Sequence, residues 1–205
     1  MEKAIQHQAA NLSFWETYAR WYEQWLAHNR YHEKILKLVT SLARPAWHVL
    51  DIGAGSGVLS LPLRKKGCHV TAVEPSGAMR DLLWKNMDAC GVVGIQTDGR
   101  PWEEIPTEAY NTSDIILACS SLHCCRVGFL SALEKVFLAR PQWVVVVTEF
   151  FSPDIRIPVA RNGYSMQYAR IEKVKSSYAY HDAQEALAHW SVLQGRVPSE
   201  KEKKE

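Results

Sequence analysis

The most constraining feature of this chain is an apolar stretch that runs directly into three closely spaced glycines. The segment VLDIGAGSG covers residues 49–57 and places glycines at positions 53, 55 and 57. We predict a strand over about Trp47–Ile52 followed by a tight turn, because glycine accepts positive φ and lets a ligand approach the backbone. A strand, a glycine-rich turn and a helix in succession are typical of nucleotide-binding sites.

The residues around these glycines restrict the ligand. A dinucleotide fingerprint has the spacing G-x-G-x-x-G, but the sixth position here is Val58. Asp51 lies two residues before the first glycine, where its negative charge would repel a pyrophosphate. A ligand with a cation or hydroxyl groups fits better. S-adenosylmethionine has an ammonium group and a positively charged sulfur, so the turn favours this cofactor.

Four segments in order then carry a resemblance to class I methyltransferases that use S-adenosylmethionine. DIGAGSG is similar to the first motif of that family, and the segments 70–79, 96–105 and 114–124 resemble the next three. Each segment lies at the carboxyl end of a predicted strand. The resemblance spans Val49 to about Phe151, roughly half of the chain, and indicates the cofactor more strongly than the substrate.

Helix and strand patterns alternate along the chain, which predicts an α/β fold with a parallel sheet covered on both faces. The resemblance implies a three-layer sandwich with strand order 3-2-1-4-5, one or two further C-terminal strands and an N-terminal helical lid. We expect strands near 47–52, 69–74, 92–97, 114–118 and 143–149. Helices are expected near 14–25, 30–42, 56–66 (kinked by Pro62), 76–91 and 127–139.

We expect one methyltransferase domain over residues 1–198, with a lid (1–44), a cofactor-binding core (45–151) and a C-terminal region (152–198). The C-terminal region should contain a helix over 160–170, a strand over 171–180 and a helix capped by Asp182. The family has two strands here, so we expect a second copy to share the sheet edge in a homodimer. The charged tail 199–205 should be disordered.

Composition narrows the partners and the compartment. A net charge of +2 gives no steering towards nucleic acid or an anionic membrane. The first twelve residues lack the apolar core of a signal peptide, and no apolar run is long enough to span a bilayer, so we expect a cytoplasmic protein. Five cysteines without a C-x-x-C pattern indicate reduced thiols.

The resemblance also implies residue roles. Asp51 would orient the turn or reach the ammonium group through water, Glu74 would accept both ribose hydroxyls, and Asp98 would accept the adenine amine. The alternative for each is a carboxylate that caps a following helix. Further cofactor contacts are expected at Gly53, Ala54, Gly55, Gly57, Pro75, Met79, Gly99, Ala118 and Tyr18.

The loop after the fourth strand is where such enzymes present the methyl group. His123 in this loop is either a general base or a structural residue that shapes the loop. Tyr22 of the first helix is the second catalytic candidate, placed where it would contact the methionine end of the cofactor; the alternative is that it packs onto the sheet. The adjacent Cys124 and Cys125 do not suit one tetrahedral zinc site, so we expect no metal.

These features predict in-line transfer of a methyl group from S-adenosylmethionine to a small-molecule acceptor, with S-adenosylhomocysteine as product. Residues 118–121 lack the proline-containing motif of enzymes that methylate the amines of nucleic acid bases. The alternative is a non-catalytic regulatory or partner subunit that binds the same cofactor. An NAD-dependent oxidoreductase is disfavoured by the glycine spacing.

Overall fold

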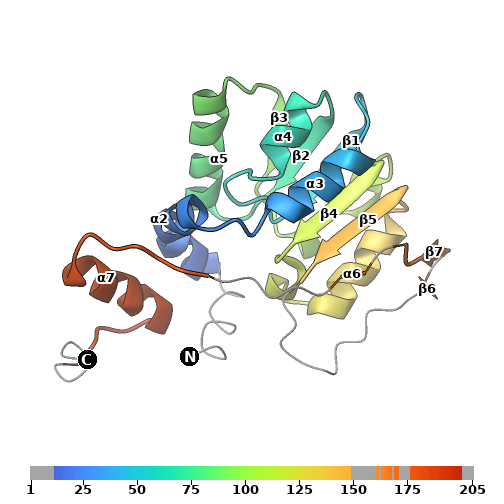
Figure 1. Ribbon diagram of the computed structural model, residues 1–205. Coiled ribbons are helices and arrows are strands. Elements are labelled where there is room, and N and C mark those ends of the chain that lie inside the picture. Colours follow the sequence, from blue (N-terminus) through green and yellow to red (C-terminus); the bar gives the residue numbers. More distant parts are fainter. Residues whose placement is uncertain (1–11, 149–159, 162, 168, 171–175, 200–205) are drawn as a thin grey trace.

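The computed structural model describes residues 12–148, 160–161, 163–167, 169–170 and 176–199, with a parallel sheet at its centre (Figure 1). Five strands of the described chain pair side by side in the order β3-β2-β1-β4-β5, all in parallel. They are β1 (His48–Ile52), β2 (His69–Val73), β3 (Ile95–Asp98), β4 (Ile115–Cys119) and β5 (Trp143–Val147). The expected fold class and strand order are confirmed.

Helices cover both faces of this sheet, because strands such as β1 present apolar side chains alternately to each face. On one face, Val49 packs in a cluster with residues of α3 (Glu33–Leu42), α4 (Ser60–Lys65) and α5 (Gly77–Cys90). On the other face, Leu50 packs in a cluster with residues of α6 (Phe129–Leu138) and of the short helix η1 (Trp102–Glu104). The result is the expected three-layer arrangement.

The two helices that follow β1 and β2 begin at well-defined residues. The Ser76 hydroxyl accepts a hydrogen bond from the Met79 backbone at 3.2 Å, and this cap starts α5 directly after β2. The expected helix over 56–66 is shorter and begins only at Ser60. Pro62 therefore lies in the first turn, where a missing N–H costs no helical bond, so it marks a helix start rather than a kink.

The N-terminal helix α2 (Leu12–His28) confirms the predicted aromatic helix, with Phe14, Tyr18 and Trp21 buried. Its neighbours are α5 and the C-terminal helix α7 (Ala183–Gln194). Figure 1 shows α7 beside α2 and away from the sheet. The Asp182 carboxylate accepts from the Glu185 N–H at 2.8 Å, which confirms the predicted cap of α7.

The C-terminal region departs from the sequence prediction. The helix expected over 160–170 is wrong, because β6 (Ala160–Arg161) and β7 (Tyr164–Ser165) form an antiparallel hairpin separate from the main sheet. Gly163 at its turn has φ +85°, a conformation that favours glycine. The Tyr164 hydroxyl donates to the Pro141 carbonyl at 2.5 Å and so ties the hairpin to the chain after α6.

The strand expected over 171–180 is also not seen in its described part, because residues 176–180 contain no strand and instead bond to α2 and to Asn29 just after it. Residues 171–175 and 200–205 lie outside the described residues. The expected homodimer and domain boundaries therefore stay predictions. None of the helices in the described ranges combines the length and apolar character needed to cross a bilayer.

Candidate functional site

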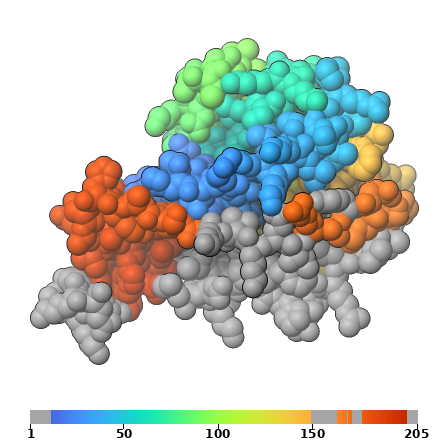
Figure 2. Space-filling view, in the orientation of Figure 1, coloured from blue at the N-terminus to red at the C-terminus, as the bar shows by residue number. Residues whose placement is uncertain are grey.

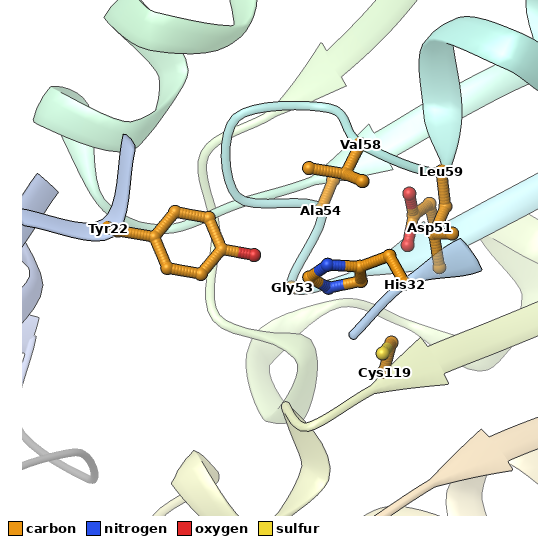
Figure 3. A pocket seen from close by; sticks show the side chains of 8 residues that line it. All are labelled: Tyr22, His32, Asp51, Gly53, Ala54, Val58, Leu59 and Cys119. Atoms are coloured by element: carbon orange, nitrogen blue, oxygen red, sulfur yellow. The ribbon is translucent and has the colours of Figure 1, made fainter. Parts of the chain in front are cut away.

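A small cavity lies at the carboxyl ends of β1 and β4, beside the glycine-rich turn (Figure 3). It measures about 20 Å³ as the space open to the centre of a water molecule. That is room for about one water molecule. Residues from the lid, the turn and β4 line it: Tyr22, His32, Asp51, Gly53, Ala54, Val58, Leu59 and Cys119.

The three glycines of the turn have different surroundings. A Cβ on Gly53 would lie 2.3 Å from the Ser121 Cβ, and one on Gly57 would lie 2.2 Å from the Leu61 Cδ1. These two glycines therefore allow close packing within the protein. A Cβ on Gly55 would lie 3.6 Å from the Tyr22 ring, an ordinary packing distance, so the buried Gly55 packs against the lid, whereas Gly53 is the glycine that lines the cavity.

Asp51 is the most buried charged group beside the cavity. The Ser60 hydroxyl donates to its Oδ2 at 2.6 Å. Burial raises the pKa of Asp51 to about 7, although the Ser60 hydrogen bond acts in the opposite direction, and the negative charge of Glu74 adds to the rise. A cation bound beside Asp51 would therefore find a carboxyl group that is about half ionised at neutral pH.

Glu74 directly follows β2, and its carboxylate links the glycine-rich turn to the start of α5. Its Oε2 accepts the Gly55 N–H at 2.8 Å and its Oε1 accepts the Ser76 N–H at 2.9 Å. Burial raises the pKa of Glu74, against the lowering effect of these two bonds. Each carboxylate oxygen can accept a second hydrogen bond, so Glu74 holds the turn and still has capacity for ligand hydroxyls.

Asp98 ends β3 and is already saturated. Its Oδ1 accepts the Arg100 backbone N–H and Nε, and its Oδ2 accepts Arg100 Nη2 at 2.7 Å and the Tyr110 hydroxyl at 2.9 Å. The Arg100 hydrogen bond lowers the pKa of Asp98 to about 2. These four bonds use its acceptor positions, so an adenine amine would have to displace Arg100 or Tyr110.

Two lid tyrosines have different surroundings. The Tyr22 side chain points towards the turn in Figure 3, and burial, followed by the nearby Cys119, Asp51 and Glu74, raises the pKa of Tyr22. Tyr18 instead shares a hydrogen bond with the Tyr178 hydroxyl. The structure thus brings Tyr22 to the cavity and directs Tyr18 towards the C-terminal segment.

The sequence reasoning missed His32, which precedes α3 and lines the cavity. Burial lowers the pKa of His32 to about 4, so its imidazole is neutral at neutral pH. The neighbouring Tyr31 shares a 2.7 Å hydrogen bond with Ser120, which follows β4 and has φ +52°. This pairing closes the α2–α3 turn over the end of β4, and no local sequence signal marks either residue.

The loop after β4 contains the short helix η3 (Leu122–Cys124) with the half-buried His123. Burial lowers the pKa of His123, so it too is mainly neutral at neutral pH. The Ser121 hydroxyl donates to the Ile52 carbonyl at 2.5 Å and fixes the loop against β1. Cys119 reaches the cavity, whereas burial raises the pKa of Cys125 to about 12.

The remaining predicted cofactor residues lie around the cavity rather than in it. Met79 and Ala118 are buried in the core, and Pro75 is half-buried between Glu74 and the cap of α5. A Cβ on Gly99 would lie 3.0 Å from Arg80 Nη1, which donates to the Glu74 carbonyl. In the described part of the chain, no three metal-ligating side chains are grouped so as to hold an ion.

Comparison with known proteins bears on this site directly. Residues 49–138 match the family model described as a methyltransferase domain. This range contains the glycine-rich turn, Glu74, Asp98 and His123. A search of curated protein sequences finds no match to the chain.

Several solved structures are similar to parts of the chain. The YcgJ protein of Bacillus subtilis is 24% identical with a TM-score of 0.46, over 51% of this chain and 45% of that one. A candidate S-adenosyl-L-methionine-dependent methyltransferase of Methanococcus maripaludis is 20% identical with a TM-score of 0.45, over 68% and 57%. The magnesium protoporphyrin IX methyltransferase of Synechocystis with bound SAM is 18% identical with a TM-score of 0.43, over 56% and 53%.

The chain thus spans about half the length of these solved structures. The residues that match the family model also form most of the central sheet and its helices, because the matched range begins in β1 and ends at the last residue of α6. The strand order is the one that the sequence resemblance implies. Residues 49–138, a little under half of the chain, therefore match a methyltransferase-domain model and contribute to a Rossmann-like α/β sheet.

Proposed function

We propose that this protein transfers a methyl group from S-adenosylmethionine to a small-molecule acceptor. One observation carries the proposal: Asp51, Gly55 and Glu74 converge at the carboxyl edge of the sheet, within the segment that matches the methyltransferase family. In open α/β sheets, ligands bind at this edge, where the strand order reverses between β1 and β4.

The residues at this edge suit the two ends of the cofactor. Asp51 would accept from its ammonium group, and the backbone of Gly53, which lines the cavity, would allow close approach. Glu74 would accept from the ribose hydroxyls with the lone pairs that Gly55 and Ser76 leave open. When bound, S-adenosylmethionine supplies an electrophilic methyl group. Asp98 remains a proposed adenine partner only if Tyr110 or Arg100 gives up its bond.

The acceptor side would be formed by the lid and the loop after β4. Trp25 and Tyr31 pack with ring centroids 5.6 Å apart, and His32 lies against Tyr31 at 4.8 Å. These rings, with His32 and His123 neutral, give an aromatic wall that suits a compact and largely uncharged acceptor. A neutral His123 has a free ring nitrogen lone pair with which to take a proton from the acceptor.

The decisive test is calorimetry with S-adenosylhomocysteine followed by a radiolabelled methyl-transfer screen with cell extract. We expect micromolar affinity, about −8 kcal/mol, and label transfer to a small molecule. NAD in the same calorimetric assay is the control and should produce no heat. Absence of binding at millimolar S-adenosylhomocysteine would contradict the proposal. Binding without any label transfer would favour a regulatory or partner subunit instead.

A further inference from the structure

Tyr22 and the helix that carries it obstruct the proposed cofactor site. The cavity beside the glycine-rich turn is about 20 Å³, and the Tyr22 ring lies within 3.6 Å of the position that a Gly55 Cβ would take. The Tyr22 ring thus occupies space beside the turn that the methionine end of the cofactor would need. If the methionine end of the cofactor binds beside Gly55, α2 must shift to admit it, and the contacts that hold α2 determine how easily it does.

One set of contacts holds the first half of α2 on the core. The Glu16 carboxylate accepts two hydrogen bonds at the start of α5, from the Gly77 N–H at 2.6 Å and the Ala78 N–H at 3.1 Å. A carboxylate at a helix N-terminus is favourable because the free N–H groups and the helix dipole both attract it. This contact fixes the first turns of α2 and leaves the second half, which contains Tyr22, to other partners.

A C-terminal segment holds that second half. We name residues Ser176–Tyr180 the strap. The Asn29 amide, just after α2, pairs with the Ser177 backbone in both directions, donating to its carbonyl at 2.9 Å and accepting its N–H at 3.1 Å. Trp25 donates to the Ser176 hydroxyl at 2.6 Å, and Gln24 donates to the Ala179 carbonyl. The strap thus runs antiparallel along α2.

Helix α7 anchors the strap in turn. The fully buried His189 ring stacks on Trp21 with centroids 4.5 Å apart, and its Nδ1 shares a 2.7 Å hydrogen bond with the Tyr180 hydroxyl. Figure 2 shows the C-terminal part against the N-terminal helix, on the side away from the central sheet. Among described residues, the bonds of the strap go to α2, Asn29 and His189, so it acts on the site through α2.

We propose that the strap is a clasp that holds Tyr22 over the cofactor site, with Asn29 as its central positioning residue, and that releasing it controls cofactor exchange. This inference rests on the proposed function. The side-chain amides of Asn29 and Gln24 that hold the strap are uncharged, so each hydrogen bond contributes only modestly to stability. The contact can therefore open and close without unfolding the core.

The test compares three variants. Asn29→Ala removes both bonds to Ser177, and Gln24→Ala removes one bond to Ala179. Thr17→Ala is the matched control, because within the part of the chain that the structure describes the Thr17 hydroxyl bonds only to backbone carbonyls of α2. Stopped-flow fluorescence measures the association rate of S-adenosylhomocysteine, and hydrogen exchange of the α2 amides reports opening without any ligand.

We expect association to speed up by about five- to 150-fold in Asn29→Ala and about two- to twelvefold in Gln24→Ala. Exchange of the α2 amides should rise in the same order, with β1 amides and Thr17→Ala unchanged. Unchanged association in Asn29→Ala, with normal binding by the unaltered protein, would overturn the clasp alone. Absence of binding by every variant would overturn the proposed function and the clasp together.

Discussion

Binding of the cofactor should release a proton, because the proposed ammonium site is a carboxyl group with an unusually high pKa. Asp51 is buried, and burial raises its pKa to about 7, although the Ser60 hydroxyl bonds to it. A bound ammonium group needs the ionised form. Affinity should therefore be highest above pH 7 and fall as Asp51 becomes protonated at lower pH.

The magnitude follows from that pKa. If only ionised Asp51 binds, the apparent dissociation constant grows with the factor 1 + 10^(pKa − pH), which is roughly 25-fold between pH 7.5 and pH 5.5. At pH 6 about 0.9 protons should be released for each ligand bound. Calorimetry with S-adenosylhomocysteine in buffers of different ionisation enthalpy measures this number directly.

Asp51→Asn is the matched control, because the amide oxygen can still accept from Ser60 but cannot titrate. Its affinity should be lower at pH 7.5 and nearly independent of pH. Proton uptake would instead indicate a histidine such as His32, since His32 gains a proton when it acquires an anionic partner. Equal pH profiles for the two proteins would refute the assignment of Asp51 to the ammonium group.

Four further outcomes are expected. Glu74→Ala should weaken S-adenosylhomocysteine binding by one to three orders of magnitude. It should also lower the midpoint of thermal unfolding, because two buried N–H groups lose their acceptor. Normal affinity in calorimetry would contradict this prediction. His123→Ala should keep affinity within about threefold, and a turnover loss larger at neutral than at high pH would identify a base. Gly57→Ala should lower the free energy of unfolding, measured in urea, by about 2–4 kcal/mol. Gly91→Ala should lower it by only about 1 kcal/mol, because φ is also positive there but no atom lies within 4 Å of the added Cβ. The free energy of unfolding of the unaltered protein should fall by about 3 kcal/mol as the pH drops from 6.5 towards 4, because burial and then Arg20 lower the pKa of His189 in the folded protein to about 4. His189→Phe should remove this loss of stability in acid.

The core of the fold was predictable because its signals are local. The run of apolar residues before Gly53, the Ser76 cap and the Gly91 stop each specify an element within a few residues of chain. The resemblance then supplied the strand order. Where the local signal was misleading, the prediction failed: β-branched and aromatic residues near 171–180 suggested a strand, but the described residues 176–180 bond to α2 and Asn29 instead.

The site was predictable only in part, because several of its partners meet through the tertiary fold. Asp51, Gly55 and Glu74 could be named from their place at strand ends. His32 and Ser120 could not, because both depend on how the α2–α3 turn folds over the end of β4. The occupancy of Asp98 by Arg100 and Tyr110 is likewise a property of side chains in space, not of the motif.

The different reasons for the three glycines link fold and function. Gly53 and Gly57 are required by Ser121 and by Leu61, so a substitution at either should disturb the turn whether or not a ligand binds. Gly55 alone faces Tyr22, across the space that the cofactor would need. The same turn is therefore held rigid at its two ends by the protein core, whereas at its centre it packs against Tyr22 of the lid helix α2. Such a division gives a fixed binding edge without requiring the lid itself to be rigid.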